Sequence, residues 1–590
     1  MKMHQALWQL IKYRPGLYTV NALAWIAILL VELGTGIVAK LFFDSLTDGS
    51  GAGMTLWTII ALVVAVGVAR ILTILAGAFT DITHRYNMGA LLRRNLLASV
   101  LAQPGAQSLG RSTGEALNTF RDDAQVVEDT ISWIVDQMAF TVYAIVALTI
   151  LVTIDARITA IVVLPLLIII AAARSVAKHI RRFREAARRA TERVTGAIGE
   201  AMEGVQTIQL AGAEKHVLSH VRELNKVRLH ATVRDRLLSQ SFHSFFWNTA
   251  TLCTGLILLA AADGLRSGTF TVGDFALFVI YVGVLAEFVA VIGDFMMHLK
   301  QGAVSMERMI SLSHDEMGSA VVAHASIHMR GPLPEARTPQ RTAHDRLETL
   351  HVRGLCFQRP QIEDQPVESE RTFALRDISF SLSKGEFVVI TGRIGSGKST
   401  LLRTLLGLLP MDRGSITWNE RLVTDPATFF VPPRCAYTPQ VPQLFSDTLQ
   451  SNIQMGFPAT PQQIAEALHL AVLEEDVPHL QAGLDTMIGA KGVKLSGGQR
   501  QRTAAARMFI RDPELLVFDD LSSALDVETE NLLWERTFAR GDRTTLVVSH
   551  RRPALERADN IILMKDGQIE GMGSLSELLE EHEEMQALWN

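Results

Sequence analysis

A glycine-rich segment in the second half of the chain has the residue types and spacing of a phosphate-binding loop. Residues 392–400 read GRIGSGKST, the pattern G-x-x-x-x-G-K-[ST], between a β-rich run at 386–390 and a helical segment that stops at Pro410. Glycines let backbone N–H groups converge on phosphates, Lys398 can reach the terminal phosphates, and Ser399 can hold Mg²⁺. The candidate ATP-binding residues are Gly392, Arg393, Ile394, Gly395, Ser396, Gly397, Lys398, Ser399 and Thr400.

Two carboxylates follow an apolar run that is typical of a buried strand. Residues 515–518 read LLVF, and Asp519 comes at the end of this run, where it can bind the metal. Asp520 comes next, where an attacking water needs a base or an orienting group, although a purely structural carboxylate is the alternative. His550 follows another strand, 544–548, and can contact a γ-phosphate, although a single histidine is more often structural.

A serine-glycine-glycine turn at the start of a helix forms half of a second phosphate site. Such a turn offers backbone N–H groups and the positive end of a helix to an anion. Because the chain already has its own phosphate loop, this turn can close over ATP only by meeting a partner chain. The sequence therefore predicts a dimer, and the residues of the turn are Leu495, Ser496, Gly497, Gly498 and Gln499.

The first half of the chain is apolar enough to span a membrane. The 590 residues are 48% hydrophobic and 20% charged, and the net charge of −5 gives no sign of nucleic-acid binding. We predict six hydrophobic segments, most of which reach the roughly 20 residues that a membrane helix needs. They lie at about 17–43, 54–79, 132–154, 158–175, 244–262 and 273–298. So many long runs argue against a soluble helical core.

Basic residues predict the orientation of these segments. Lysine and arginine are concentrated before the first segment and in the two long connections at 80–131 and 176–243, whereas 44–53 has two aspartates and no basic residue. By the positive-inside rule, the N-terminus, both long connections and the second half are cytoplasmic. We expect a multi-pass protein of a bacterial plasma (inner) membrane. The three cysteines, Cys253, Cys356 and Cys435, have no metal-ligand or disulfide spacing, which fits a reducing compartment.

The elements that carry these residues predict a multi-domain chain. Both long connections have helical composition, so the membrane helices should extend well beyond the membrane. Prolines and mixed charge at 314–346 indicate a linker. We therefore predict an all-α six-helix transmembrane domain with long cytoplasmic helical extensions at 1–313. An α/β P-loop ATP-binding domain follows at 347–590.

In this order the motifs closely resemble the ATP-binding cassette (ABC) family, and the six-span first half is similar to its multidrug and lipid exporters. The resemblance implies a half-transporter that uses ATP and Mg²⁺. It identifies the turn at 495–499 as the signature motif, His550 as the switch histidine and Gln440, in YTPQ at 437–440, as the Q-loop residue. The implied D-loop residues are Ser523, Ala524, Leu525 and Asp526. The implied catalytic residues are Asp520, His550 and Gln440, and the implied Mg²⁺ ligands are Ser399, Gln440 and Asp519.

Two departures from the family pattern bear on the ATP site. The family usually has glutamate where this chain has Asp520, which is one methylene shorter and should hold a water less well. Arg359 occupies the expected place of the aromatic residue that stacks on adenine, and a guanidinium can also stack on a base. A degenerate, mainly regulatory half of a heterodimer, with weak hydrolysis at its own site, is therefore the alternative to an active half-transporter.

The substrate is not identified by the sequence. The expected partners are a second half-transporter, identical or different, membrane lipid and a hydrophobic or amphipathic drug, lipid or peptide, with no nucleic acid. Ionisable residues inside membrane segments are candidates for a transport path. Four such carboxylates predict an acidic cavity that favours cations, unless they pair internally or lie at the interface. They are Glu32, Asp136, Glu287 and Asp294.

Overall fold

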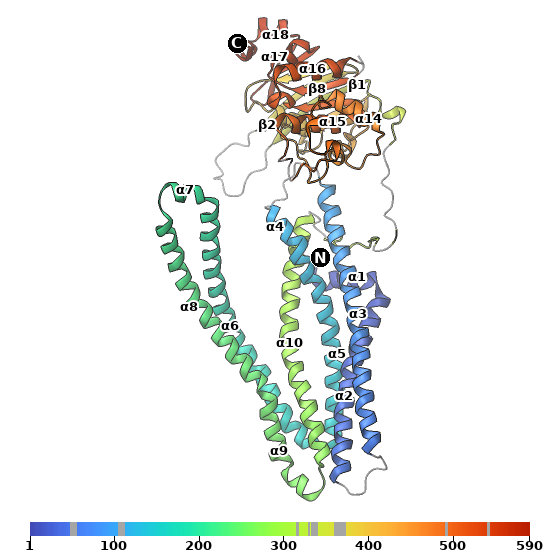
Figure 1. Ribbon diagram of the computed structural model, residues 1–590, viewed down its shortest axis with the longest axis vertical. Helices are drawn as coiled ribbons and strands as arrows, with labels where there is room; N and C mark the ends of the chain where they lie inside the picture. The colour runs from blue at the N-terminus through green and yellow to red at the C-terminus, as the bar shows by residue number, and fades with distance from the viewer. Residues whose placement is uncertain are drawn as a thin grey trace. The chain divides into compact units, whose positions relative to one another are not determined.

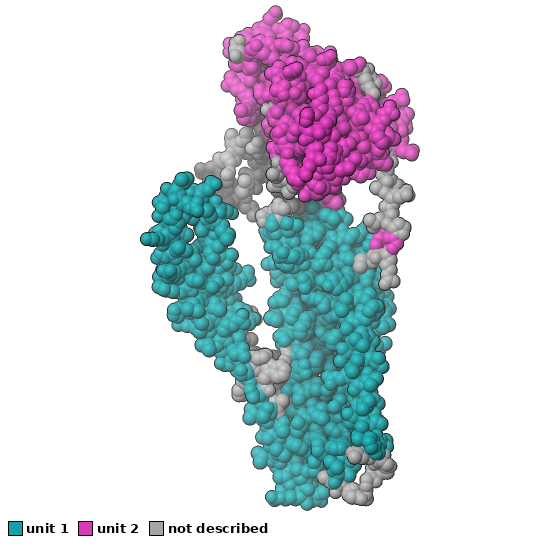
Figure 2. All heavy atoms as spheres, in the orientation of Figure 1, with its two compact units in different colours: residues 1–100, 111–327 teal, residues 101–110, 328–590 magenta. Residues whose placement is uncertain are grey.

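The computed structural model describes residues 1–47, 56–103, 113–313, 318–328, 331, 340–358, 373–489, 492, 494–539 and 543–589. The chain divides into two compact units, Met1–Val100 with Arg111–Ile327, and Leu101–Gly110 with His328–Asn590 (Figure 2). The first unit is helical and the second is α/β, which confirms the predicted fold class. Part of the predicted linker, at 314–317, 329–330 and 332–339, lies outside the described residues.

Long helices build the first unit (Figure 1). Their bounds are α1 Met3–Tyr13, α2 Pro15–Thr47, α3 Leu56–Ala102, α4 Thr113–Asn118, the π-helix η1 Thr119–Asp123, α5 Ala124–Ile154, α6 Ala156–Glu203, α7 Val205–Leu210, α8 Glu214–Trp247, α9 Thr249–Ser267 and α10 Val272–Ser313. The predicted helical extensions are confirmed, because α3 and α6 continue far beyond their apolar segments. The short helix α7 joins α6 to α8 within the long connection at 176–243.

Four stretches of the described residues are long and apolar enough to cross a membrane. They are Pro15–Leu46, Trp57–Ala102, Gly114–Ile154 and Val272–Ser313, and Ala156–Pro165 is a shorter apolar stretch. The fourth and fifth predicted segments are helical, but among the described residues neither meets this combined criterion of length and apolar composition. Arg157 and Arg174 lie at the two ends of the fourth predicted segment in α6, and α9 carries Asp263 and Arg266. Six membrane spans therefore stay a prediction.

Aromatic residues pack the core of the first unit where α2, α5 and α10 meet. Tyr143 and Tyr281 are fully buried with ring centroids 6.3 Å apart, and the Tyr281 hydroxyl donates to the Leu33 carbonyl at 2.8 Å. Gly36 allows this approach, because a Cβ there would collide with the Tyr281 ring. This packing fixes α2 against α10.

The second unit contains two sheets and their covering helices. Its strands are β1 Thr349–Gln358, β2 Phe373–Ser383, β3 Phe387–Thr391, β4 Arg413–Trp418, β5 Arg421–Leu422, β6 Cys435–Thr438, β7 Leu515–Asp519, β8 Thr544–Val548, β9 Asn560–Lys565 and β10 Gln568–Gly573. Its helices are α11 Lys398–Leu405, α12 Pro426–Phe429, α13 Leu449–Gln454, α14 Pro461–Leu470, α15 Gly497–Phe509, α16 Val527–Phe538, α17 Arg552–Arg557, α18 Leu575–Glu581 and α19 Glu583–Trp589. Short 3₁₀ turns lie at Ala343–Asp345, Val477–His479, Gly483–Asp485 and Leu521–Ala524.

The strand order explains how distant motifs meet. The larger sheet has the order β10-β9-β3-β8-β7-β6, and all neighbours are parallel except β10 and β9. The smaller sheet, β2-β1-β4-β5, is antiparallel. All residues of β3, β7 and β8 are buried, as expected for central parallel strands covered on both faces. Because these strands are parallel, their carboxyl ends lie at one edge of the sheet.

Candidate nucleotide-binding site

The phosphate loop connects β3 to α11. Gly392 and Gly397 adopt φ angles of 141° and 101°, in a region that side chains rarely enter. A Cβ at Gly392 would collide with the carbonyl oxygen of Met564 in β9, and one at Gly397 would lie 3.1 Å from the Leu375 side chain. These two glycines let the loop pass close to Met564 and Leu375, as the sequence pattern predicts for a phosphate-binding loop.

Lys398, the first residue of α11, turns its ammonium back onto the loop. Its Nζ donates to the carbonyl oxygens of Gly392 at 2.6 Å and Arg393 at 2.7 Å. Burial lowers the pKa of Lys398, and the negative charges of Asp520 and Asp519 oppose this change. The ammonium is thus held at the loop, beside two carboxylates.

Ser399 and Asp519 provide hard oxygen atoms at one point. The Ser399 hydroxyl donates to Asp519 Oδ1 at 2.8 Å, and the Tyr437 hydroxyl lies 3.3 Å from Asp519 Oδ2. Asp519 is fully buried at the end of β7. A hydroxyl and a carboxylate fit Mg²⁺, which takes few protein ligands and keeps others from phosphate and water. Among the described residues no cluster of three His, Cys, Asp or Glu offers a different metal site.

Asp520 is buried at the same edge, in an uncommon backbone conformation. Its φ is 52°, a left-handed value that aspartate tolerates better than most residues, and its N–H donates to the Val548 carbonyl at 3.0 Å. Gln440 Nε2 donates to Asp520 Oδ2 at 3.0 Å, while buried Oδ1 has no hydrogen-bond partner among the described residues. Burial raises the pKa of Asp520, and the charge of His550 and the Gln440 hydrogen bond oppose this rise. An unpaired carboxylate oxygen next to the phosphate loop fits a position for water.

His550 completes this group from the end of β8. It is exposed, and its neighbour Ser549 donates its N–H to the Ile390 carbonyl of β3 at 3.1 Å. The fold therefore brings Lys398, Ser399, Gln440, Asp519, Asp520 and His550 to the carboxyl ends of adjacent strands. These residues fit a triphosphate with Mg²⁺.

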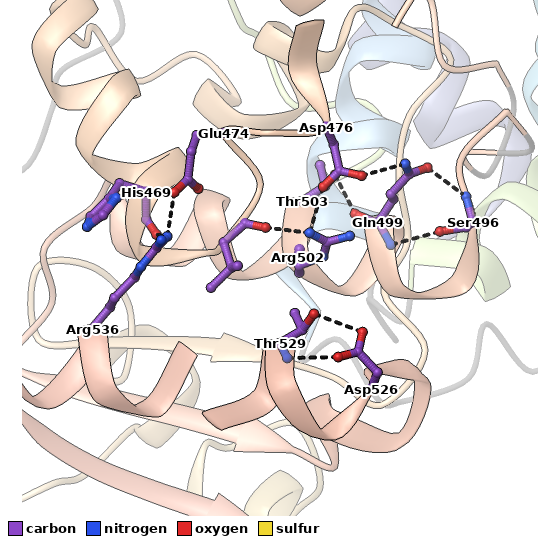
Figure 3. A network of polar contacts seen from close by, with 11 residues as sticks. His469, Glu474, Asp476, Ser496, Gln499, Arg502, Thr503, Asp526, Thr529 and Arg536 are labelled. Atoms are coloured by element: carbon purple, nitrogen blue, oxygen red, sulfur yellow. Dashed lines mark hydrogen bonds and ion pairs between the residues drawn. The ribbon is translucent and has the colours of Figure 1, made fainter. Parts of the chain in front are cut away.

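The signature turn starts α15 with a capping box. Ser496 Oγ accepts from the Gln499 N–H at 3.2 Å, and Gln499 Oε1 accepts from the Ser496 N–H at 3.0 Å (Figure 3). Gln499 Nε2 also donates to Asp476 Oδ1 at 2.8 Å, and Arg502 Nη1 donates to Asp476 Oδ2 at 2.6 Å. The first N–H groups of α15 lack intrahelical partners, so the turn presents donors on a fixed frame.

The D-loop packs directly on the signature turn. A Cβ at Gly498 would lie 3.0 Å from the Ala524 carbonyl oxygen, and the Ala524 N–H donates to Gln501 Oε1 at 3.2 Å. Asp526 caps α16 by accepting from the Thr529 N–H at 2.8 Å (Figure 3). Within the part of the chain that the structure describes, no hydrogen bond or ion pair joins the signature turn to the phosphate loop. The two phosphate sites are separate in one chain.

Some predicted site residues are not brought into this arrangement. Arg359 lies outside the described residues, and the side chain of Ser523 is not described.

Two residues that the sequence analysis did not identify, Arg551 and Glu530, connect parts of the site. Arg551 Nη1 donates to the Leu525 carbonyl and to Glu530 Oε2, both at 2.9 Å, and Glu530 is fully buried. Arg551 thereby joins the segment after His550 to the D-loop.

The four membrane carboxylates have different surroundings. Glu32 Oε2 lies 2.7 Å from Arg70 Nη1, so this carboxylate is paired internally. Asp136 Oδ1 is buried and has no hydrogen-bond partner among the described residues. Glu287 and Asp294 are exposed on α10, seven residues apart and therefore on one face. An acidic cavity stays a prediction for this pair and Asp136.

Comparisons with known proteins agree with both units. The family model for the ABC transporter transmembrane region matches residues 20–287, and the ABC transporter family model matches residues 375–523. The ATP-dependent lipid A-core flippase 1 of Colwellia psychrerythraea is 26% identical over 586 residues, which cover 97% of this chain and 94% of that protein. A probable multidrug resistance ABC transporter ATP-binding/permease protein of Bacillus subtilis is 29% identical over 512 residues, covering 83% and 81%.

The fold also matches a solved structure. A bacterial Atm1-family ABC exporter with ATP bound aligns with a TM-score of 0.74 at 22% identity, and the match covers 97% of this chain and 98% of that one. The two family-model matches together span more than half of the chain, in the order of its helical and α/β units. The protein therefore belongs to the ABC transporters, in which an ATP-hydrolysing domain is coupled to transport across a membrane.

Proposed function

We propose that this chain is one half of an ATP-driven exporter of a hydrophobic or amphipathic drug, lipid or peptide. The observation that carries the proposal is the pair of separate phosphate sites: a loop with Lys398, Ser399 and Asp519, and a signature turn with no bond to that loop. The names of the similar proteins, a lipid A-core flippase and a multidrug transporter, support export. The proposed domains are 1–313 for membrane passage, 314–346 as linker and 347–590 for ATP.

Two chains would close head to tail over two ATP molecules. Each phosphate loop would then meet the partner's signature turn, whose capped helix end stabilises phosphate charge. Closure and hydrolysis would shift the membrane helices between two states that open to opposite sides. The proposed orientation keeps the N-terminus and the ATP-binding domain in the cytoplasm of a bacterial cell.

The proposed roles follow from the positions of the side chains. ATP with Mg²⁺ supplies the free energy of a phosphoanhydride bond. Lys398 would bind the terminal phosphates, and Ser399, Asp519 and Gln440 would hold the ion. The free oxygen of Asp520 would orient the attacking water, and the exposed His550 would contact the γ-phosphate. The predicted stack of Arg359 on adenine stays a proposal.

Transport can be tested in inside-out membrane vesicles that contain the protein. We expect ATP-dependent uptake of an amphipathic fluorescent probe, either a cationic dye or a labelled lipid, and no uptake with Lys398→Ala. Joint replacement of Glu287 and Asp294 by glutamine and asparagine should reduce uptake of the cation more than uptake of the lipid. Wild-type vesicles that transport no probe of either class, although they hydrolyse ATP, would contradict export of amphipathic substrates.

The second candidate is a regulatory half with weak hydrolysis at its own site. Asp520 favours this reading because its carboxylate is shorter than glutamate and is already bonded to Gln440. The intact Lys398, Ser496 and His550 favour an active half instead.

Asp520→Glu separates these candidates. If chain length limits the positioning of water, the longer carboxylate should raise ATP turnover by roughly tenfold or more, because base and positioning effects are that large. Asp520→Asn should lower turnover below that of the wild type. ATP turnover of the purified protein, measured by phosphate release, checks both. Unchanged turnover in both variants would show that Asp520 does not act on the water and would favour the regulatory half.

A further inference from the structure

Helix α19 contacts the phosphate loop through a charge pair. Glu584, in α19, places its Oε1 atom 2.5 Å from Arg393 Nε, the second residue of the loop. The Glu584 side chain is only 4% exposed, whereas the Arg393 side chain is 68% exposed. The contact has the distance of an ion pair without the direction of a hydrogen bond. A loop residue is thus held by a buried carboxylate almost two hundred residues later in the sequence.

Arg393 is the nearer of two cations to this carboxylate. Lys565 Nζ lies 4.0 Å from Glu584 Oε2, but it lies only 3.0 Å from Glu570 Oε1, to which it donates. A buried carboxylate strongly favours a charged partner, because an uncompensated charge in the protein interior is costly. Glu584 therefore restrains the Arg393 side chain.

The main chain of Arg393 is held as well, by the residue expected to bind phosphate. The Arg393 carbonyl accepts from Lys398 Nζ at 2.7 Å and from the Ser396 N–H at 3.1 Å. The Ser396 carbonyl accepts in turn from the Gly567 N–H at 3.1 Å. A shift of Arg393 would move the carbonyl that holds the Lys398 ammonium.

The far end of α19 contacts the segment that follows His550. Trp589 accepts through its carbonyl from Arg552 Nη2 at 2.8 Å, and the Arg552 guanidinium lies 4.8 Å from the centre of the Trp589 ring. Met585, between the two ends, is fully buried in the core of the second unit. One short helix is therefore anchored in the core and touches both the phosphate loop and the start of α17.

We propose that Glu584 is a positioning residue for nucleotide binding. Through Arg393 it holds the phosphate loop, with Lys398, in the conformation that accepts a nucleoside triphosphate, and α19 braces this loop against α17. The inference rests on the proposed ATP site at Lys398. Glu584 does not contact the nucleotide, so its removal should change the KM for ATP and leave kcat nearly unchanged.

The test uses the full-length protein and two readouts: the ATP concentration dependence of hydrolysis and the binding of a fluorescent ATP analogue. Glu584→Gln should raise the KM and the dissociation constant about fivefold, as expected for a charge pair with one exposed member. Arg393→Gln should have a similar effect. The double variant should resemble the single variants, because both remove the same pair. Glu580→Gln, an exposed glutamate on α18, is the matched control and should behave as the wild type.

The outcomes separate this inference from the proposed site. A wild-type KM in Glu584→Gln would overturn the positioning role. A general structural role would also overturn it. That role would be indicated if Glu584→Gln lowered both kcat and the unfolding temperature and if the effects of Glu584→Gln and Arg393→Gln were fully additive in the double variant. If Lys398→Ala binds the analogue as the wild type does, the proposed ATP site itself is wrong. If only Lys398→Ala loses binding, the site stands and Glu584 does not position it.

Discussion

Replacement of Lys398 by alanine is expected to lower ATP hydrolysis at least roughly 100-fold, the scale found when one preorganised charge-stabilising donor is removed from an active site. Two carbonyl oxygens hold the ammonium at the loop, where it interacts electrostatically with Asp519 and Asp520. Alanine keeps the helix propensity of α11 and removes the ammonium that the Gly392 and Arg393 carbonyls hold at the loop. Phosphate release and nucleotide binding measure the loss.

The matched control is Lys384→Ala. Lys384 is an exposed lysine in the turn between β2 and β3, outside the phosphate loop. Its removal should change turnover by less than about twofold, as is usual for surface substitutions. Equal turnover in the wild type and Lys398→Ala would mean that the hydrolysis measured does not occur at this loop.

Ser496→Arg should have an effect as large as that of Lys398→Ala, although Ser496 makes no bond to the phosphate loop of its own chain. Arginine removes the hydroxyl that caps α15 and places a long side chain where the partner's phosphate should meet the helix end. Loss of the cap costs about 1 kcal/mol of helix stability. Obstruction of the closed dimer should lower hydrolysis at least roughly 100-fold. ATP binding to the chain's own loop should remain nearly unchanged.

Thr460→Arg is the control for this substitution. Thr460 caps α14 with the same capping box, in which Gln463 plays the part of Gln499. Both variants lose a cap of similar strength, so a difference in turnover reports the position of the helix end and not its stability. If Thr460→Arg and Ser496→Arg lose activity equally, the special role of the signature turn is wrong.

The sequence predicted the parts of the site that depend on local pattern. The phosphate loop needs glycine at positions with positive φ, and a run of apolar residues that ends in Asp519 is recognisable as a buried strand. The helical extensions were also predictable, because the composition of α6 and α8 favours helix over long stretches. Each of these features is contained in one continuous stretch of the sequence.

Contacts that depend on the order of strands were not predictable in this way. Tyr437 reaches Asp519 only because β6 pairs with β7, and burial raises the pKa of this tyrosine to about 12. The contact of Glu584 with Arg393 likewise requires α19 to return to the phosphate loop. Periodicity reports which face of an element is buried but not which distant element covers it.

The backbone at Asp520 adds information that residue type alone does not contain. Its left-handed conformation is one that aspartate adopts more readily than glutamate, so the shorter side chain suits the backbone while it shortens the reach toward water. The expected gain from Asp520→Glu therefore carries a small conformational cost. The measured change in turnover reports the balance of the two effects.

In the proposed closed dimer, each signature turn serves the phosphate loop of the other chain. Dimers of two differently tagged copies test it by ATP hydrolysis. One dimer joins a Lys398→Ala chain to a Ser496→Arg chain, and the other joins a chain carrying both substitutions to a wild-type chain. If the sites are shared, the first dimer keeps one intact site and the second keeps none. We therefore predict activity in the first dimer and at least roughly 100-fold less in the second. Activity in the second dimer and none in the first would show instead that each signature turn serves the phosphate loop of its own chain.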